Sequence, residues 1–149
     1  MTEAERADKQ EAADLLDRYV TFLDERRFDD WLRLFTDNCY YTMILLEDYV
    51  KDTNLVAIGE DKARLAGRIE VGQTVERDPT VHLLTGLSVR GADGTLTASS
   101  NFAVLCMGAI KCSGRYHLEL RRRQGSLLIE RCTAVLHANV INGIIYLPV

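Results

Sequence analysis

The sequence of 149 residues contains no uninterrupted apolar run long enough to cross a membrane, and its first eleven residues are polar and charged. It also has no strong excess of one charge, since 18 Lys and Arg residues stand against 22 Asp and Glu residues, for a net charge of −4. These absences argue against an export signal, a membrane anchor and a nucleic-acid-binding surface. They predict a cytoplasmic protein with no nucleic acid and no membrane among its partners.

The sequence also lacks the cysteine spacing of a metal or redox centre. Its four cysteines, Cys39, Cys106, Cys112 and Cys132, form no C-x-x-C pair, and each lies within an apolar or strand-like run. This pattern favours reduced, packed thiols over a disulfide or zinc framework. A glycine-rich phosphate loop and a G-x-S-x-G nucleophile elbow are missing as well, so neither motif predicts an enzyme class.

What is present is a strand-like alternation of apolar and polar residues in the last third of the chain. It runs through residues 95–107, 110–123 and 126–139, and Gln124-Gly125 supplies a tight turn before the last run. Three strands with such short connections predict an antiparallel meander, which needs a cover over one face. The expected core positions are Leu96, Ala98, Phe102, Val104 and Cys106, then Tyr116, Leu118 and Leu120, then Leu127, Ile129, Thr133 and Val135.

Helical periodicity in the first half of the chain predicts that cover. The apolar stripe of a first helix, residues 3–24, consists of Ala12, Leu15, Leu16, Tyr19, Val20 and Leu23. A second helix is expected over residues 28–35, with Trp31, Leu32, Leu34 and Phe35 buried and Thr36-Asp37-Asn38 ending it. A third is expected from Gly59-Glu60-Asp61 to Glu76, with Leu65 and Ile69 facing inward.

Two further strands, residues 39–46 and 81–90, complete the expected elements, with a polar loop at 48–54 and a turn at 91–94. Helices come first and strands follow, which is typical of an α+β arrangement. The sequence therefore predicts one domain, residues 1–149, in which N-terminal helices cover a curved antiparallel sheet of four or five strands.

Nine short blocks then stand out along the chain. They are Tyr19 with Leu23-Asp24, Trp31-Leu32, Leu34-Phe35, Cys39-Tyr40-Tyr41, Asp61 with Leu65 and Arg68-Ile69, Ser99 to Val104, Gly114-Arg115-Tyr116, Ile129-Glu130-Arg131 and Pro148-Val149. In order and spacing they resemble the small (beta) subunit of aromatic-ring-hydroxylating dioxygenases. The resemblance covers most of the chain, although no single block is diagnostic.

The resemblance implies a cone-shaped α+β fold of the nuclear-transport-factor and ketosteroid-isomerase type, also called cystatin-like. It implies a structural subunit without its own catalytic centre, which assembles with an iron-containing alpha subunit in aromatic hydrocarbon catabolism. Three of each subunit are common in the family, so a homo-oligomer is expected, a trimer within a hexamer or a dimer if the chain is isolated. The segment 107–111 and the N-terminal arm are shorter than the family pattern, and both bear on partner contacts.

Cofactors can be assessed from the residues themselves. The C-x-H and C-x-x-H pairs that hold a Rieske cluster do not occur. The three histidines, His82, His117 and His137, lie on separate predicted strands, so a site of two histidines and one carboxylate would have to assemble in space. Structural or surface roles are commoner for such histidines. We expect no cofactor and no metal in this chain, and the Rieske cluster and mononuclear iron in the alpha partner.

A small acid-base enzyme, such as an isomerase, dehydratase or cyclase, is the alternative, and a ligand-binding module is another. The candidate catalytic residues are Asp24, Tyr40, Tyr41, His82 and His117. A carboxylate with a raised pKa could take a proton while a tyrosine or histidine stabilised an enolate oxygen. In the simpler reading Asp24 caps its helix or pairs with Arg27. A structural subunit would have its cone interior filled by large side chains such as Phe35, Phe102, Tyr116 and Leu118. A pocket in that interior lined by polar groups would indicate an enzyme or a ligand-binding module.

The end of the sequence is unusually apolar. Residues 138–149 contain no charged side chain, and Asn139, Asn142 and Gly143 are expected to bend the segment. An exposed segment of this kind would promote aggregation. We therefore expect a subunit interface at Tyr146, Leu147, Pro148 and Val149.

Overall fold

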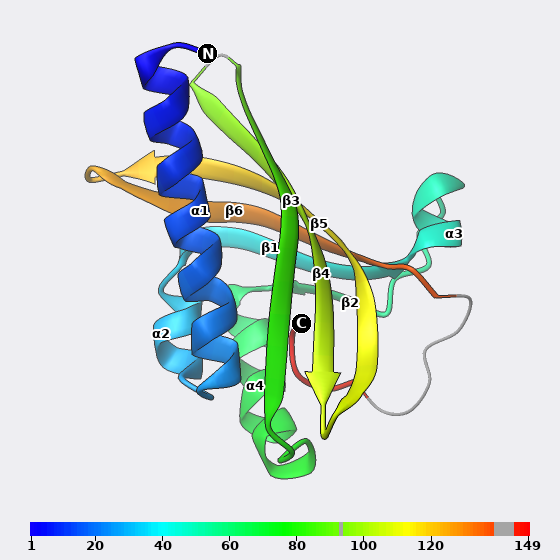
Figure 1. Ribbon diagram of the computed structural model, residues 1–149. Coiled ribbons are helices and arrows are strands. Elements are labelled where there is room, and N and C mark those ends of the chain that lie inside the picture. Colours follow the sequence, from blue (N-terminus) through cyan, green and yellow to red (C-terminus); the bar gives the residue numbers. More distant parts are fainter. Residues whose placement is uncertain (93, 139–144) are drawn as a thin grey trace.

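The computed structural model describes residues 1–92, 94–138 and 145–149. Its elements are α1 (Glu3–Asp24), α2 (Phe28–Leu32), β1 (Phe35–Leu45), α3 (Leu46–Val50), β2 (Ile58–Asp61), α4 (Lys62–Val75), β3 (Thr80–Ala92), β4 (Thr95–Cys106), β5 (Ala109–Arg123) and β6 (Ser126–Leu136). The strands form one sheet in the order β2-β1-β6-β5-β4-β3 (Figure 1). Among the described residues, no helix is both long enough and apolar enough to cross a membrane.

Over the described residues the sheet is mixed and has six strands, which corrects the expected antiparallel sheet of four or five. Its neighbours pair antiparallel except β1 and β6, which run parallel. The sixth strand is β2, which occupies the residues expected to begin the third helix. Asp61 ends that strand and caps α4, since its carboxylate accepts from the main-chain nitrogen of Arg64 at 2.9 Å. The α+β class itself is as the sequence predicted.

Two shorter corrections concern the connections around β1. The expected second helix ends at Leu32, and residues 36–38 belong to the strand, because the main-chain oxygen of Leu34 already accepts from Ile129 of β6 at 2.8 Å. The expected polar loop after β1 begins with the five-residue helix α3. The expected turn at 91–94 includes residue 93, which lies outside the described residues.

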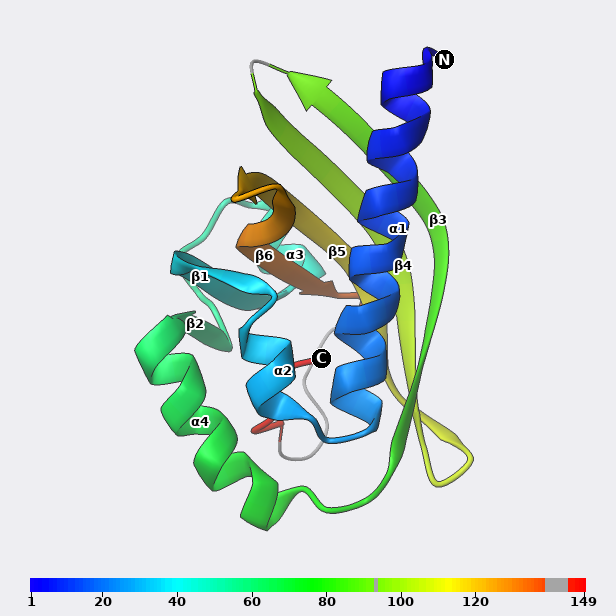
Figure 2. The same ribbon diagram turned by 90° about the vertical axis from the view of Figure 1, so that its left-hand side faces the viewer.

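The predicted stripe of α1 is confirmed, and it faces the sheet. The helix begins with a capping box, in which Thr2 and Glu5 bond each other's main-chain nitrogens. Its buried residues are the six expected ones, Ala12, Leu15, Leu16, Tyr19, Val20 and Leu23. Figure 2 shows α1 and α2 lying within the curl of the sheet, with α4 closing the side below β1 and β2.

A β-bulge in β6 corrects the expected core face of that strand. Glu119 pairs with Arg131 whereas Leu120 pairs with Ile129, so Glu130 is an extra residue without an opposite partner. Because side chains alternate along a strand, the extra residue moves the core face from Ile129 to Cys132 and the even-numbered positions that follow. Thr133 is therefore half-buried on the outer face of the sheet, where it lines a hollow.

Large side chains fill the space between helices and sheet. Phe35, Phe102, Tyr116 and Leu118 are all at most 3% exposed and belong to one hydrophobic cluster. Phe102 and Tyr116 stack with ring centroids 4.2 Å apart, and edge contacts join Tyr19, Trp31 and Tyr41 into the same aromatic core. The interior is thus largely occupied by its own side chains.

Candidate functional site

Two of the expected catalytic residues meet at the edge of this interior. Asp24 is the last residue of α1, and His82 lies near the start of β3. The Asp24 Oδ1 atom lies 2.6 Å from His82 Nδ1, and Oδ2 accepts from the His82 main-chain nitrogen at 2.8 Å. Thr80 donates its hydroxyl to the same carboxylate at 3.0 Å. The helix end and the strand therefore hold a carboxylate and an imidazole in one fixed geometry.

The electrostatics of this pair differ from those expected for a general base. Partial burial raises the pKa of Asp24, but hydrogen bonds from His82 and Thr80 outweigh burial and hold that pKa below its ordinary value. The acid-base alternative needed a raised pKa at Asp24, and that prediction is wrong. Asp24 is therefore a carboxylate at neutral pH. A carboxylate facing Nδ1 favours the imidazole tautomer with its proton there. The Nε2 atom of His82 is buried and has no partner among the described residues.

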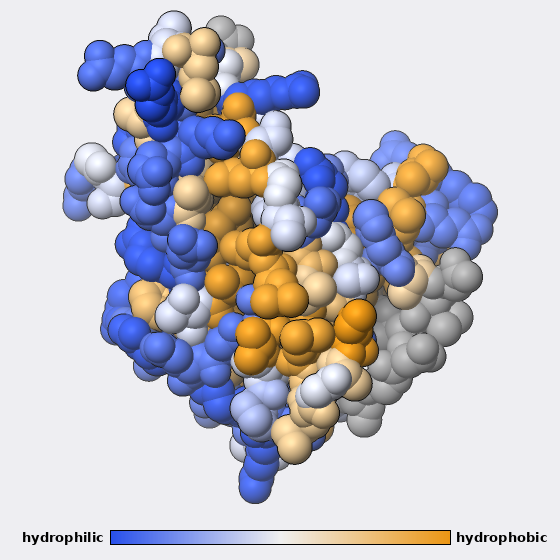
Figure 3. All heavy atoms as spheres, viewed as in Figure 1, coloured by the Kyte–Doolittle hydropathy of each residue, from blue (hydrophilic) through white to orange (hydrophobic). Residues whose placement is uncertain are grey.

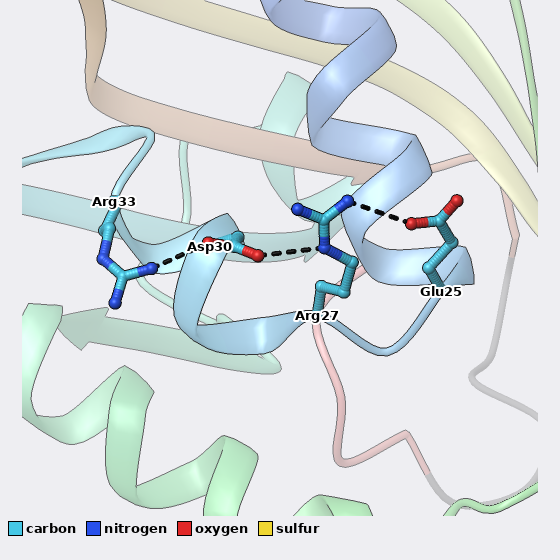
Figure 4. Close-up of polar contacts among 4 residues, drawn as sticks. All are labelled: Glu25, Arg27, Asp30 and Arg33. Carbon is cyan, nitrogen blue, oxygen red and sulfur yellow. Dashed lines mark hydrogen bonds and ion pairs between the residues drawn. The ribbon is translucent and has the colours of Figure 1, made fainter.

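The expected pairing of Asp24 with Arg27 is also wrong. Figure 4 shows Arg27 reaching Glu25, at 3.2 Å, and Asp30, at 2.9 Å, and Arg33 reaching the same Asp30. These side chains are largely solvent-exposed, so the ion pairs contribute little to stability. They organise the α1–α2 corner and leave Asp24 free to face β3.

A cluster of buried hydroxyl and thiol groups lies deeper in the interior. Tyr19, Tyr41 and Tyr116 are fully buried, and burial raises the pKa of each phenol well above its ordinary value. Burial also raises the pKa of the Cys132 thiol to about 12. All four groups therefore stay protonated, and the phenols can act as neutral hydrogen-bond donors. The Tyr116 hydroxyl has no partner in the part of the chain that the structure describes.

Sequence reasoning did not assign a site role to Tyr19 or Tyr116, because both occupy apolar positions of amphipathic elements. The available signal was the polar hydroxyl on a core-facing ring, since a buried tyrosine usually requires a hydrogen-bond partner. Tyr41 was among the candidates, and the structure places it at the centre of the cluster.

The end of the sequence enters this cluster. Leu147, Pro148 and Val149 are buried by residues of their own chain, and Figures 1 and 2 both show the C-terminal end between the helices and the sheet. The main-chain oxygen of Val149 accepts from the Tyr19 hydroxyl at 2.7 Å. These three residues therefore face the chain's own interior, whereas Tyr146, the fourth residue of the expected subunit interface, is half-buried. The bend expected at residues 139–143 lies outside the described residues.

Tyr40 and His117 do not join the interior. Tyr40 is 42% exposed on β1, and His117 faces outward on β5, where its ring stacks on Tyr49 with centroids 5.4 Å apart. Partial burial, followed by the charge of Arg115, lowers the pKa of His117. A surface hollow of about 500 Å³ surrounds this pair on the outer face of the sheet. The five candidates are thus divided between two faces of the sheet.

The structure also bears on metal binding. Among residues 1–92, 94–138 and 145–149, no three His, Cys, Asp or Glu side chains converge as a metal site would require. His82 lies inside the cone and His117 on its outer face, so these two histidines cannot share one metal ion.

A curved sheet closed over N-terminal helices, with its interior filled, defines a cone-shaped α+β protein of the cystatin-like type. A Nostoc punctiforme protein with a cystatin-like fold matches it with a TM-score of 0.69 and 15% identity, over 90% of this chain and 94% of that one. The family model for the ring hydroxylating beta subunit matches residues 18–143, so the chain belongs to that family.

Two relatives illustrate this membership. The small oxygenase component of the p-cumate 2,3-dioxygenase system of Pseudomonas putida is 29% identical, over 87% of this chain and 81% of that one. A structure assigned as the beta subunit of an aromatic-ring-hydroxylating dioxygenase from Novosphingobium aromaticivorans is similar with a TM-score of 0.84. It is 21% identical, over 94% of this chain and 95% of that one.

Proposed function

We propose that this chain is the structural small subunit of a multicomponent aromatic-ring-hydroxylating dioxygenase and assembles with an iron-containing alpha subunit. The family match across residues 18–143 carries this proposal. The Rieske cluster and the mononuclear iron are assigned to the alpha partner. We further propose that three copies of this chain assemble within a hexamer. The proposed location of the complex is the cytoplasm.

The filled interior supports a structural role. The crevice that reaches His82 from outside has a volume of only about 30 Å³ and is lined in part by Leu147, Pro148 and Val149. A site for an aromatic substrate would need several hundred Å³. The pairing of Asp24 with His82 then joins α1 to β3, and an acid-base enzyme is not favoured.

An apolar patch on the outer face of the sheet supports assembly with a partner. Val81 and Leu83 on β3 and Ile110 on β5 are 53%, 49% and 68% exposed. Val81 pairs with Leu105, and Leu105 with Ile110, so these side chains share one face. Figure 3 shows apolar side chains gathered across this face of β3 to β5. Patches of this kind usually mark protein contacts.

The proposal is tested by co-expressing the chain with a tagged alpha subunit of the same family and measuring co-purification and oxygenase activity. We expect a stable complex whose iron-sulfur absorbance follows the alpha subunit. In the double variant Leu83→Asp/Ile110→Asp the complex should be weakened at least tenfold. Val71→Asp, which changes a residue 55% exposed on α4 outside the patch, is the matched control. A chain that binds no alpha subunit of the family would contradict the proposal.

A further inference from the structure

Residues 146–149 lie in the interior in the manner of a bound peptide. The Glu76 carboxylate, which follows α4, accepts from the main-chain nitrogens of Tyr146 and Leu147, the latter at 2.9 Å. The Leu147 side chain lies against Gly72, where a Cβ would come within 2.7 Å of Leu147 Cδ2. The main chain of the segment therefore bonds to the residue that follows α4, and its Leu147 side chain packs against Gly72 within α4.

The last residue of this segment places its main-chain oxygen beside two phenol hydroxyl groups. The main-chain oxygen of Val149 accepts from Tyr19, at 2.7 Å, and from Tyr41, at 3.2 Å. Both phenols stay protonated because burial raises their pKa, and the Trp31 ring contacts both of theirs. Two neutral donors beside flat aromatic walls suit a carbonyl or carboxylate oxygen on a compact apolar body.

Further buried polar atoms in the same interior have no partner within the described residues, among them Tyr116 Oη, His82 Nε2 and Trp31 Nε1. Such atoms weaken a purely structural core, because burial without a hydrogen bond costs free energy. They are the groups that would orient a second polar atom of a ligand.

We propose that the interior is a binding site for a small ligand with a carboxylate or carbonyl oxygen on a flat apolar body, and that residues 146–149 are its plug. With the plug in place, the crevice of about 30 Å³ beside His82 has room for a water molecule but not for such a ligand. Leu147, Pro148 and Val149 line that crevice, so their withdrawal would join it to the volume they leave. This site goes beyond the structural role and does not depend on it.

The test uses Trp31, the sole tryptophan of the chain, as the reporter. The probes are the tetrapeptide Tyr-Leu-Pro-Val and benzoate, added to the full chain and to a chain ending at Ile145. We expect a saturable change in Trp31 fluorescence with both probes in the shortened chain and none in the full chain. Adding Tyr19→Phe and Tyr41→Phe to the shortened chain should weaken binding of both probes at least tenfold.

A second variant covers the case in which shortening unfolds the chain. Gly72→Ala keeps every residue of the interior, and its added Cβ crowds only residues of the plug, Leu147 at 2.7 Å and Tyr146 at 3.2 Å. We expect it to bind benzoate more weakly than the shortened chain, because the tethered plug still competes. The proposal is overturned if a folded shortened chain fails to bind benzoate, whether or not it binds the tetrapeptide. If the shortened chain unfolds, absence of benzoate binding or of benzoate-induced refolding in Gly72→Ala overturns it.

Discussion

The Tyr41 hydroxyl makes two hydrogen bonds to Val149, donating to its main-chain oxygen at 3.2 Å and accepting from its main-chain nitrogen at 3.1 Å. The Tyr41 side chain therefore satisfies both main-chain groups of Val149, which in a β-sheet would bond to a neighbouring strand. The neighbouring Tyr40 points to the other face of the strand and is exposed. Two adjacent tyrosines therefore have opposite roles.

Replacing Tyr41 by Phe should destabilise the chain by roughly 1–3 kcal/mol, because the buried Val149 nitrogen loses its acceptor. Urea unfolding monitored by circular dichroism measures this change. Tyr40→Phe removes an exposed hydroxyl and should alter the free energy of unfolding by less than about 0.5 kcal/mol. Equal effects of the two substitutions would mean that the segment is not held by Tyr41.

Asp24→Asn should destabilise the chain by roughly 1–3 kcal/mol at pH 7, since hydrogen bonds to a charged group are lost. The effect should depend on pH. The pKa of Asp24 is lowered in the folded chain, so its stabilisation is fully present above the ordinary value of about 3.9 and is lost as the pH falls through the lower folded value.

The difference in unfolding free energy between the original chain and Asp24→Asn should therefore shrink below about pH 4. Chemical unfolding at intervals from pH 7 to pH 3 measures it. Glu25→Gln, at the exposed neighbour, is the control and should show little difference at any pH. A difference for Asp24→Asn that stays constant through the acid range would contradict the hydrogen-bond geometry between the Asp24 carboxylate and His82.

Trp31→Ala should cost roughly 3–5 kcal/mol, because the ring is fully buried and its removal leaves a cavity. Trp31→Phe should cost much less, since the ring contacts with Tyr19, Phe35 and Tyr41 are partly kept. The indole nitrogen has no hydrogen-bond partner in the described part of the chain, so the Phe variant breaks no such bond. Thermal unfolding compares the three proteins, and an unchanged melting temperature for Trp31→Ala would place this ring at the surface.

Two glycines should respond in opposite directions to alanine. A Cβ on Gly114 would lie 1.9 Å from the main-chain oxygen of Val135, so Gly114→Ala forces β5 and β6 apart and should cost at least about 3 kcal/mol. Gly67 is exposed in α4 with nothing near its Cβ position, so Gly67→Ala should stabilise by about 1 kcal/mol. Urea unfolding of both variants tests the close approach of β5 to β6. A mild effect at Gly114 would rule that approach out.

The periodicity of apolar residues was sufficient to predict those elements whose buried face repeats along their own sequence. The stripe of α1 and the alternation of β4 and β5 came directly from residue spacing, because 3.6-residue and two-residue repeats reflect which face is buried. The strand β2 escaped prediction, since four residues carry too little periodicity, and its pairing with β1 is made across the connection that contains α3. The bulge at Glu130 escaped because it exists only in the register between β5 and β6, which the residues of β6 alone do not reveal.

The class of fold, the family resemblance and the absence of Rieske ligand spacing could be predicted from the amino-acid sequence, because these depend on residue order alone. Only the folded chain shows that Asp24 meets His82 and not Arg27, and that Tyr40 and His117 face away from Tyr41. It also shows that residues 147–149 of the apolar end lie inside the cone, against other residues of the same chain. An apolar segment must be buried, but sequence does not say against what, since burial depends on the shape of the space that distant helices and strands enclose.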